Sequence, residues 1–169
     1  LNIGGVYTQG AASTLMVAVN GTSSGSVVAT GNATATAGYT VALNVSNYVP
    51  NGATYTIIDG AAGAGVAAPA ITVTGNNQAT FTATTIGADL VLTASRTANG
   101  FASDAPANDP NGKAVGTVLD TITNPSADMT TVLNTMAGLS SSQVASAMDT
   151  MIPEIDAGVI NTSTTVLNN

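Results

Sequence analysis

The acidic side chains are the main candidates for chemistry in this chain, because it contains no His and no Cys. Eight of the nine acids are Asp, and most stand at expected turns or helix starts: Asp59, Asp104, Asp109, Asp128 and Asp156. Asp is common at such positions because its short side chain accepts hydrogen bonds from nearby backbone N–H groups. We therefore expect these carboxylates to be turn and cap residues rather than general acids or bases.

Two of these acids, Asp104 and Asp109, lie in a Gly-, Pro- and Asn-rich stretch where backbone carbonyls could join them around Ca²⁺. The spacing of a calcium-binding loop is absent, so we expect no metal and no cofactor, and these two residues remain the candidates if calcium binds. Asp89, in an expected strand, should face solvent or pair with Arg96.

The residues of the common hydrolytic mechanisms are missing. Without His no Ser-His-Asp triad can form, and a Ser–Lys pair would depend on Lys113. Glycan hydrolysis needs two carboxylates roughly 5–10 Å apart in a cleft, which the sequence does not indicate. No phosphate-binding glycine motif opens a helix. The sequence therefore predicts a protein that is not an enzyme.

Charge is scarce and mostly negative. The net charge is −7, and Arg96 and Lys113 are the two cations. Nucleic-acid binding depends on clustered Lys and Arg, so we expect no nucleic-acid partner. No run of 18 apolar residues predicts a transmembrane helix. No charged side chain precedes Asp59, and polarity there comes from Thr, Ser and Asn, which suits a secreted β-rich protein.

Alternating apolar residues predict about eight short strands over residues 1–98. The expected strands are 5–9, 13–19, 27–30, 39–45, 54–58, 71–74, 79–84 and 89–94, with a small-residue loop at 60–68. Turn pairs such as Asn20-Gly21 separate them. Aromatic residues make up only 4% of the chain, which favours thin stacked layers, either a short-strand β-solenoid or a sandwich.

After an expected linker at 99–112, apolar residues recur at helical spacing and predict four short helices over 113–169. Val115–Ile122 belong to the first helix, and Asn124-Pro125 should start the second, which ends at Gly138. Ser140 and Gln143 form a capping box for the third, and Pro153 opens the fourth. The predicted fold class is thus a mainly β N-terminal half followed by a small all-α segment.

Several motifs, taken in order, resemble the C-terminal end of autotransporter (type V secretion) passengers. The run Gly5-Val6-Tyr7-Thr8-Gln9 followed by Ser13-Thr14-Leu15 resembles a run of their β-helices, and Tyr55-Thr56-Ile57-Ile58 resembles a strand near it. Leu139-Ser140-x-x-Gln143, continuing to Pro153-Glu154, resembles the helical stretch before the translocator barrel. The chain departs from the family pattern in holding neither the barrel nor a regular upstream β-helix.

The resemblance implies a secreted or cell-surface segment of a Gram-negative-type bacterium, taken from a longer precursor. Its β half would be the autochaperone end of a β-helical passenger, and its partners the upstream passenger or the translocator barrel. Asn168-Asn169 is similar to the paired asparagines at which some family members are cleaved, although an arbitrary chain end is the preferred explanation of the pair.

A second interpretation is a self-assembling extracellular fibre or surface-layer subunit. The uncharged strands over 5–58 lack the Lys residues that commonly block pairing between strand edges. Identical subunits would then be the partners. A precursor that continues into a barrel favours the autotransporter, whereas a polymeric protein ending near Asn169 favours the fibre.

Overall fold

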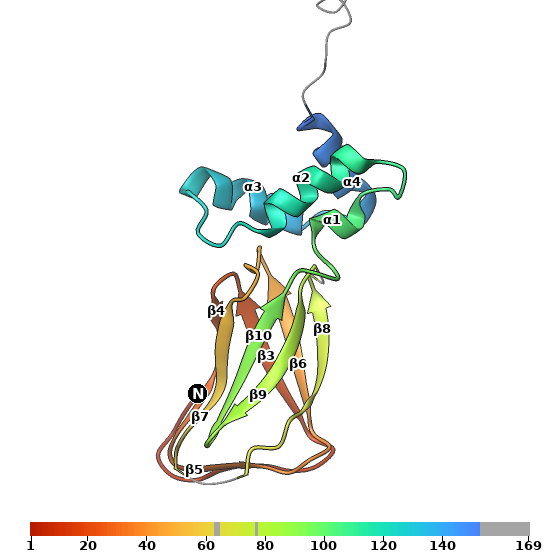
Figure 1. The fold of residues 1–169 in the computed structure, drawn as a ribbon. Coiled ribbons are helices and arrows are strands. Elements are labelled where there is room, and N and C mark those ends of the chain that lie inside the picture. The colour runs from red at the N-terminus through yellow and green to blue at the C-terminus, as the bar shows by residue number, and fades with distance from the viewer. Residues whose placement is uncertain (63–64, 77, 153–169) are drawn as a thin grey trace, which may run out of the picture.

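A stack of β-strands carries four helices at one end of its strands (Figure 1), as seen in a computed structural model that describes residues 1–62, 65–76 and 78–152. The strands are β1 (Asn2–Ile3), β2 (Tyr7–Gln9), β3 (Thr14–Asn20), β4 (Ser23–Ser24), β5 (Val27–Ala35), β6 (Thr40–Ser46), β7 (Thr54–Ala62), β8 (Ala70–Gly75), β9 (Thr80–Ile86) and β10 (Asp89–Ser95). The helices are α1 (Phe101–Asp104), α2 (Pro110–Asp120), α3 (Ala127–Ala137) and α4 (Ser141–Thr150). The mainly β half followed by helices confirms the predicted fold class.

The strands form two sheets, and the chain passes from one sheet to the other. The first sheet has the order β1-β5-β7-β10-β9, with β2 also paired to β5, and the second has the order β4-β3-β6-β8. One pass through each sheet makes a coil, so β1, β2 and β3 form the first coil, β5 and β6 the second, and β7 and β8 the third. Equivalent strands of successive coils pair in parallel, as in a β-solenoid.

The coils stack in register, with Leu15, Val41 and Ile71 on neighbouring strands of the second sheet. The number of residues between stacked positions differs from one coil to the next, which explains why no fixed repeat is visible in the sequence. Apolar residues from both sheets share one core, whose fully buried members include Val41, Leu43, Ile57, Leu90 and Leu92. Burying such a side chain contributes about 1.5–3 kcal/mol.

The two ends of the stack differ. At one end, β9 and β10 form an antiparallel hairpin in which β10 lies between β7 and β9. At the other end, β1 and β2 are the outermost strands of the first sheet, and β3 is covered in the second sheet only where Val19 and Asn20 pair with β4. Within the described residues, the first coil is therefore an open end.

The short strands β1 and β4 were not predicted, the strand expected at 5–9 begins only at Tyr7, and two other strands continue well past their expected ends. β5 continues through Gly31-Asn32 to Ala35, and β7 continues through Gly60 into the stretch expected to be a loop. Parallel pairing between these two strands satisfies the backbone there, which overrides the local turn signals. Gly60 also fits where a side chain would not, since a Cβ would lie 2.6 Å from the Ala33 Cβ.

The predicted helix starts also needed correction. α1 and the first turn of α2 both lie in the stretch expected to be a linker. α2 begins three residues earlier than predicted because Asp109 caps it, accepting a hydrogen bond from Gly112 N. α3 is capped by Ser126, not started by Asn124-Pro125. The capping box of Ser140 and Gln143 is confirmed. The expected fourth helix at Pro153 lies outside the described residues.

Gly75 and Gly52 offer a matched test of the coil packing, because both have positive φ angles (82° and 78°) but differ in surroundings. A Cβ on Gly75 would lie 2.3 Å from the Val45 carbonyl oxygen, whereas nothing lies within 4 Å of one on Gly52. Gly52→Ala should cost about 1–2 kcal/mol from backbone strain alone. Gly75→Ala should cost a further ~1–3 kcal/mol because the coils must move apart. Urea unfolding measures both, and equal costs would contradict the stacked arrangement.

Two tyrosines in the core should make the free energy of unfolding fall at alkaline pH. Burial raises the pKa values of Tyr39 and Tyr55 from 10.0 to about 12, and their hydroxyls donate to the carbonyls of Ala67 (2.9 Å) and Gly21 (2.6 Å). Between these pH values the unfolded chain has lost phenolic protons that the folded chain keeps, so stability falls as pH rises. Urea unfolding from pH 9 upward, with tyrosinate absorbance, should show this decline starting near the ordinary pKa, and Tyr55→Phe should reduce it.

Candidate functional site

The β part and the helices meet at a buried arginine. Arg96 directly follows β10 and is only 2% exposed. Its guanidinium carbon lies 4.5 Å from the ring centroid of Tyr48 and 4.4 Å from that of Phe101, and the two rings are nearly parallel. Cation–π attraction of this kind grows when the cation is removed from water. One of the chain's two cations is thus placed at the junction.

A single carboxylate, that of Asp120, holds this arginine and the start of α1. Its Oδ1 accepts from Arg96 Nε at 2.8 Å and from Phe101 N at 2.9 Å, and its Oδ2 accepts from Ala102 N at 3.0 Å. Asp120 is the last residue of α2, so the bonds tie together the end of a strand, α1 and α2. The Arg96 Nη1 also donates to the Val49 carbonyl at 3.5 Å.

Tyr48 makes the second connection between strands and helices. Its backbone N–H donates to Asn134 Oδ1 at 2.9 Å, and its hydroxyl lies 3.0 and 2.8 Å from the carbonyls of Leu119 and Ile122. Burial raises the pKa of this phenol. The hydroxyl has one hydrogen, which these two carbonyls share; Leu119 lies in the last turn of α2 and Ile122 just beyond its end.

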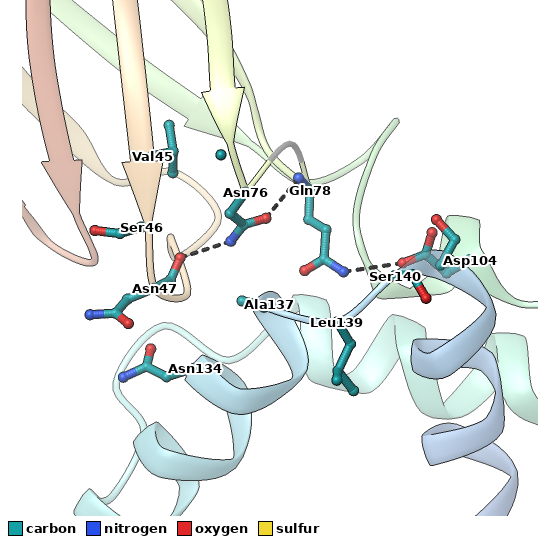
Figure 2. Close-up of a pocket in the computed structure, with 13 residues that line it drawn as sticks. Val45, Ser46, Asn47, Asn76, Gln78, Asp104, Asn134, Ala137, Leu139 and Ser140 are labelled. Carbon is teal, nitrogen blue, oxygen red and sulfur yellow. Dashed lines mark hydrogen bonds between the residues drawn. The ribbon is translucent and has the colours of Figure 1, made fainter.

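A polar pocket of about 480 Å³ lies beside this junction, between the ends of β6 and β8 and the turn that joins α3 to α4. Figure 2 shows a chain of hydrogen bonds along its wall: Asn76 Nδ2 donates to the Asn47 carbonyl at 2.8 Å, Gln78 N donates to Asn76 Oδ1 at 3.0 Å, and Gln78 Nε2 donates to Asp104 Oδ2 at 3.1 Å. Gln78 is 6% exposed, and its Oε1 is buried without a partner. Leaving a buried acceptor without a donor costs about 1–3 kcal/mol of folding free energy.

The residues singled out in the sequence do not come together in one place. Asp104 lines the pocket, whereas Asp109 caps α2. Asp89 accepts from the Gly60 backbone and does not pair with Arg96, which corrects that alternative. In the described part of the chain, no group of three or more His, Cys, Asp or Glu side chains could hold a metal. Asn168 and Asn169 lie outside the described residues.

Sequence reasoning did not identify the pocket, because its walls come from four separate stretches of the chain. Its polar residues, among them Asn47, Asn76, Gln78 and Asn134, are of types that are abundant throughout the sequence. The sequence held one signal for the Arg96–Asp120 pair: Arg96 is one of only two cations and directly follows an expected strand, and an arginine that becomes buried there needs a counter-charge.

Comparison with known proteins gives no family: no family model, no curated protein and no solved structure matches the chain. None of the helices in the described residues is both long and apolar enough to span a membrane.

Removing the charge of Asp120 tests the junction. Asp120→Asn leaves Arg96 buried without a counter-ion and should destabilise the protein by about 3–5 kcal/mol. Asp128→Asn, which removes an exposed acid in the first turn of α3, should cost less than about 1 kcal/mol. Thermal unfolding of both variants gives the comparison, and similar small losses would mean that the buried pair does not hold the two parts together.

Proposed function

We propose that this chain is a non-enzymatic structural segment of an autotransporter-like protein, secreted or displayed on the surface of a Gram-negative-type bacterium. Its solenoid supports the folding and display of a longer β-helical passenger. The order of motifs from Gly5 to Glu154 supports this assignment, and so does the stack of parallel coils with one hairpin end and one open end.

The open face of the first coil is the observation that carries the proposal. In β3, Leu15, Val17 and Val19 point into the core, yet Leu15 is only partly buried. Tyr7 of β2 is likewise half-buried against the same core. One more coil stacked on this face would cover both side chains in the way that the second coil covers the first.

The backbone of β3 presents hydrogen-bonding groups to such a coil. The Thr40 N–H donates to the Ser13 carbonyl, and successive peptide groups of a strand point to opposite sides, so the backbone groups of Met16 point away from β6. On that outer side the Ala18 carbonyl accepts from Gly25 N at 2.9 Å. Met16 itself is 81% exposed, and no charged residue lies in β1, β2 or β3 to oppose pairing.

Hydrogen exchange on the chain alone and on the longest natural polypeptide that contains it tests the proposal. The Met16 amide should exchange at least tenfold more slowly in the longer protein, because an added coil pairs with it. Met16→Pro removes that amide without removing a β3–β6 bond and should lower the refolding yield of the longer protein. Met16→Val, which keeps the amide, is the control. Equal exchange of Met16 in both proteins would rule out coil stacking on this face.

The alternative, a self-assembling fibre or surface-layer subunit, is favoured by the same uncharged edge. In that case the chain alone should protect the Met16 amide as its concentration rises, and sedimentation should show growing assemblies that Met16→Pro prevents. A monomer at all concentrations would exclude the fibre and leave the autotransporter proposal unaffected.

A further inference from the structure

The hairpin of β3 and β4 occupies part of the edge on which a further coil would stack. β4 pairs with Val19 and Asn20 at the end of β3 nearer the helices (Figure 1). Next to these pairs, the Gly25 N–H donates to the Ala18 carbonyl at 2.9 Å. The last three of the seven residues of β3 are therefore already covered on their outer side, which leaves residues 14–17 as the free edge.

Burial along β3 shows the same division. Of its inward-pointing side chains, Leu15 is half-buried, Val17 is 6% exposed and Val19 is fully buried. The end of the strand beside β4 needs no further cover, whereas the end that holds Leu15 does. An added coil thus has apolar surface to bury only along the free part of the edge.

β4 is anchored to the rest of the β part through its turn. The Gly21 N–H donates to the Ser46 carbonyl at 3.2 Å, and the Gly21 carbonyl accepts from the Tyr55 hydroxyl at 2.6 Å. Tyr55 belongs to β7 in the other sheet and is a core residue. Gly21 has a φ of 58°, which glycine adopts without strain. Displacing β4 would break its pairing with β3 and disturb this turn, so a further coil meets β4 as a fixed element.

The first sheet starts at a matching level. The Leu1 carbonyl accepts from Val28 N at 2.8 Å, and the Leu1 amino group donates to the Ser26 carbonyl at 2.6 Å. Ser26 directly follows Gly25 in the segment that joins β4 to β5. A residue joined to the nitrogen of Leu1 would therefore lie beside this segment, close to the limit of the free edge of β3.

We propose that β4 is a fixed stop for the coil that stacks on this end of the solenoid. The added strand pairs in parallel with residues 14–17, ends before Ala18, and crosses to Leu1 beside the segment that joins β4 to β5. The amides of Thr14 and Met16, which point away from β6, are the ones it pairs with. The inference rests on the proposed function, because a longer passenger supplies this coil.

The stop defines the kind of partner that fits. β6 pairs with all seven residues of β3, whereas a strand on the outer edge has only residues 14–17 to pair with. The partner is therefore a short strand followed at once by a crossing to the first sheet. A preceding strand as long as β6 would run into β4.

Hydrogen exchange on the chain alone and on the longest natural polypeptide that contains it tests the stop. In the longer protein the Thr14 and Met16 amides should exchange at least tenfold more slowly, while the Gly25 amide stays at least as protected because it keeps its bond to Ala18. If Met16 becomes protected but Gly25 exchanges at least tenfold faster, the added coil displaces β4. That result would reject the stop and leave the proposed function intact, whereas an unprotected Met16 would reject both.

A disulfide between β3 and β4 gives a second test by locking the stop in place. Val19 and Ser24 lie opposite each other, and the bond from Gly25 to Ala18 makes theirs a non-hydrogen-bonded pair, whose side chains are close enough to bridge. The chain has no Cys, so Val19→Cys with Ser24→Cys places the bridge at these two positions. The oxidised longer protein should protect the Met16 amide as well as its reduced form, which is the matched control for folding. Loss of that protection on oxidation alone would mean that β4 has to leave the edge, and would overturn the proposal.

Discussion

The buried ion pair of Arg96 and Asp120 determines how the two parts of this molecule are joined. An arginine removed from water is costly unless its charge is balanced and its N–H groups are bonded. Here the Asp120 carboxylate balances the charge and the rings of Tyr48 and Phe101 lie against the guanidinium plane, while the Arg96 Nη2 is buried without a partner. Because Asp120 also caps α1, the helices cannot shift against the strand ends without leaving the guanidinium uncompensated. The position of the helices depends on this pair together with the hydrogen bonds from Tyr48 to Asn134 and from Gln78 to Asp104.

The β part needs no comparable electrostatic device. Its coils are held by backbone pairing in parallel register and by a core of small and branched apolar side chains. Such a stack has no inherent length, since each coil contacts only its neighbours. The β9–β10 hairpin ends the first sheet by placing an antiparallel pair where a further parallel strand would lie, whereas β8 remains the edge strand of the second sheet. The helices then cover the ends of the strands and leave the first coil available for pairing.

The sequence predicted the parts whose signal is local. β3 and β6 carry Leu or Val at every second position, and α4 carries its capping box. The extensions of β5 and β7 were missed because Gly31 and Gly60 look like turn residues until a neighbouring strand pairs with them. The parallel register, the Arg96–Asp120 pair and the pocket join distant stretches of the chain, and no local pattern encodes them. The autotransporter assignment and the absence of enzymatic activity remain predictions.

The open edge of the first coil and the polar pocket lie on different surfaces of the molecule. Stacking on the first coil would lengthen the solenoid away from the hairpin, while the pocket stays beside the helices at the ends of β6 and β8. A passenger of any length, or a fibre that grows through this edge, would therefore keep one pocket per chain uncovered. The low charge of the chain fits the open edge, because edge pairing uses uncharged backbone groups.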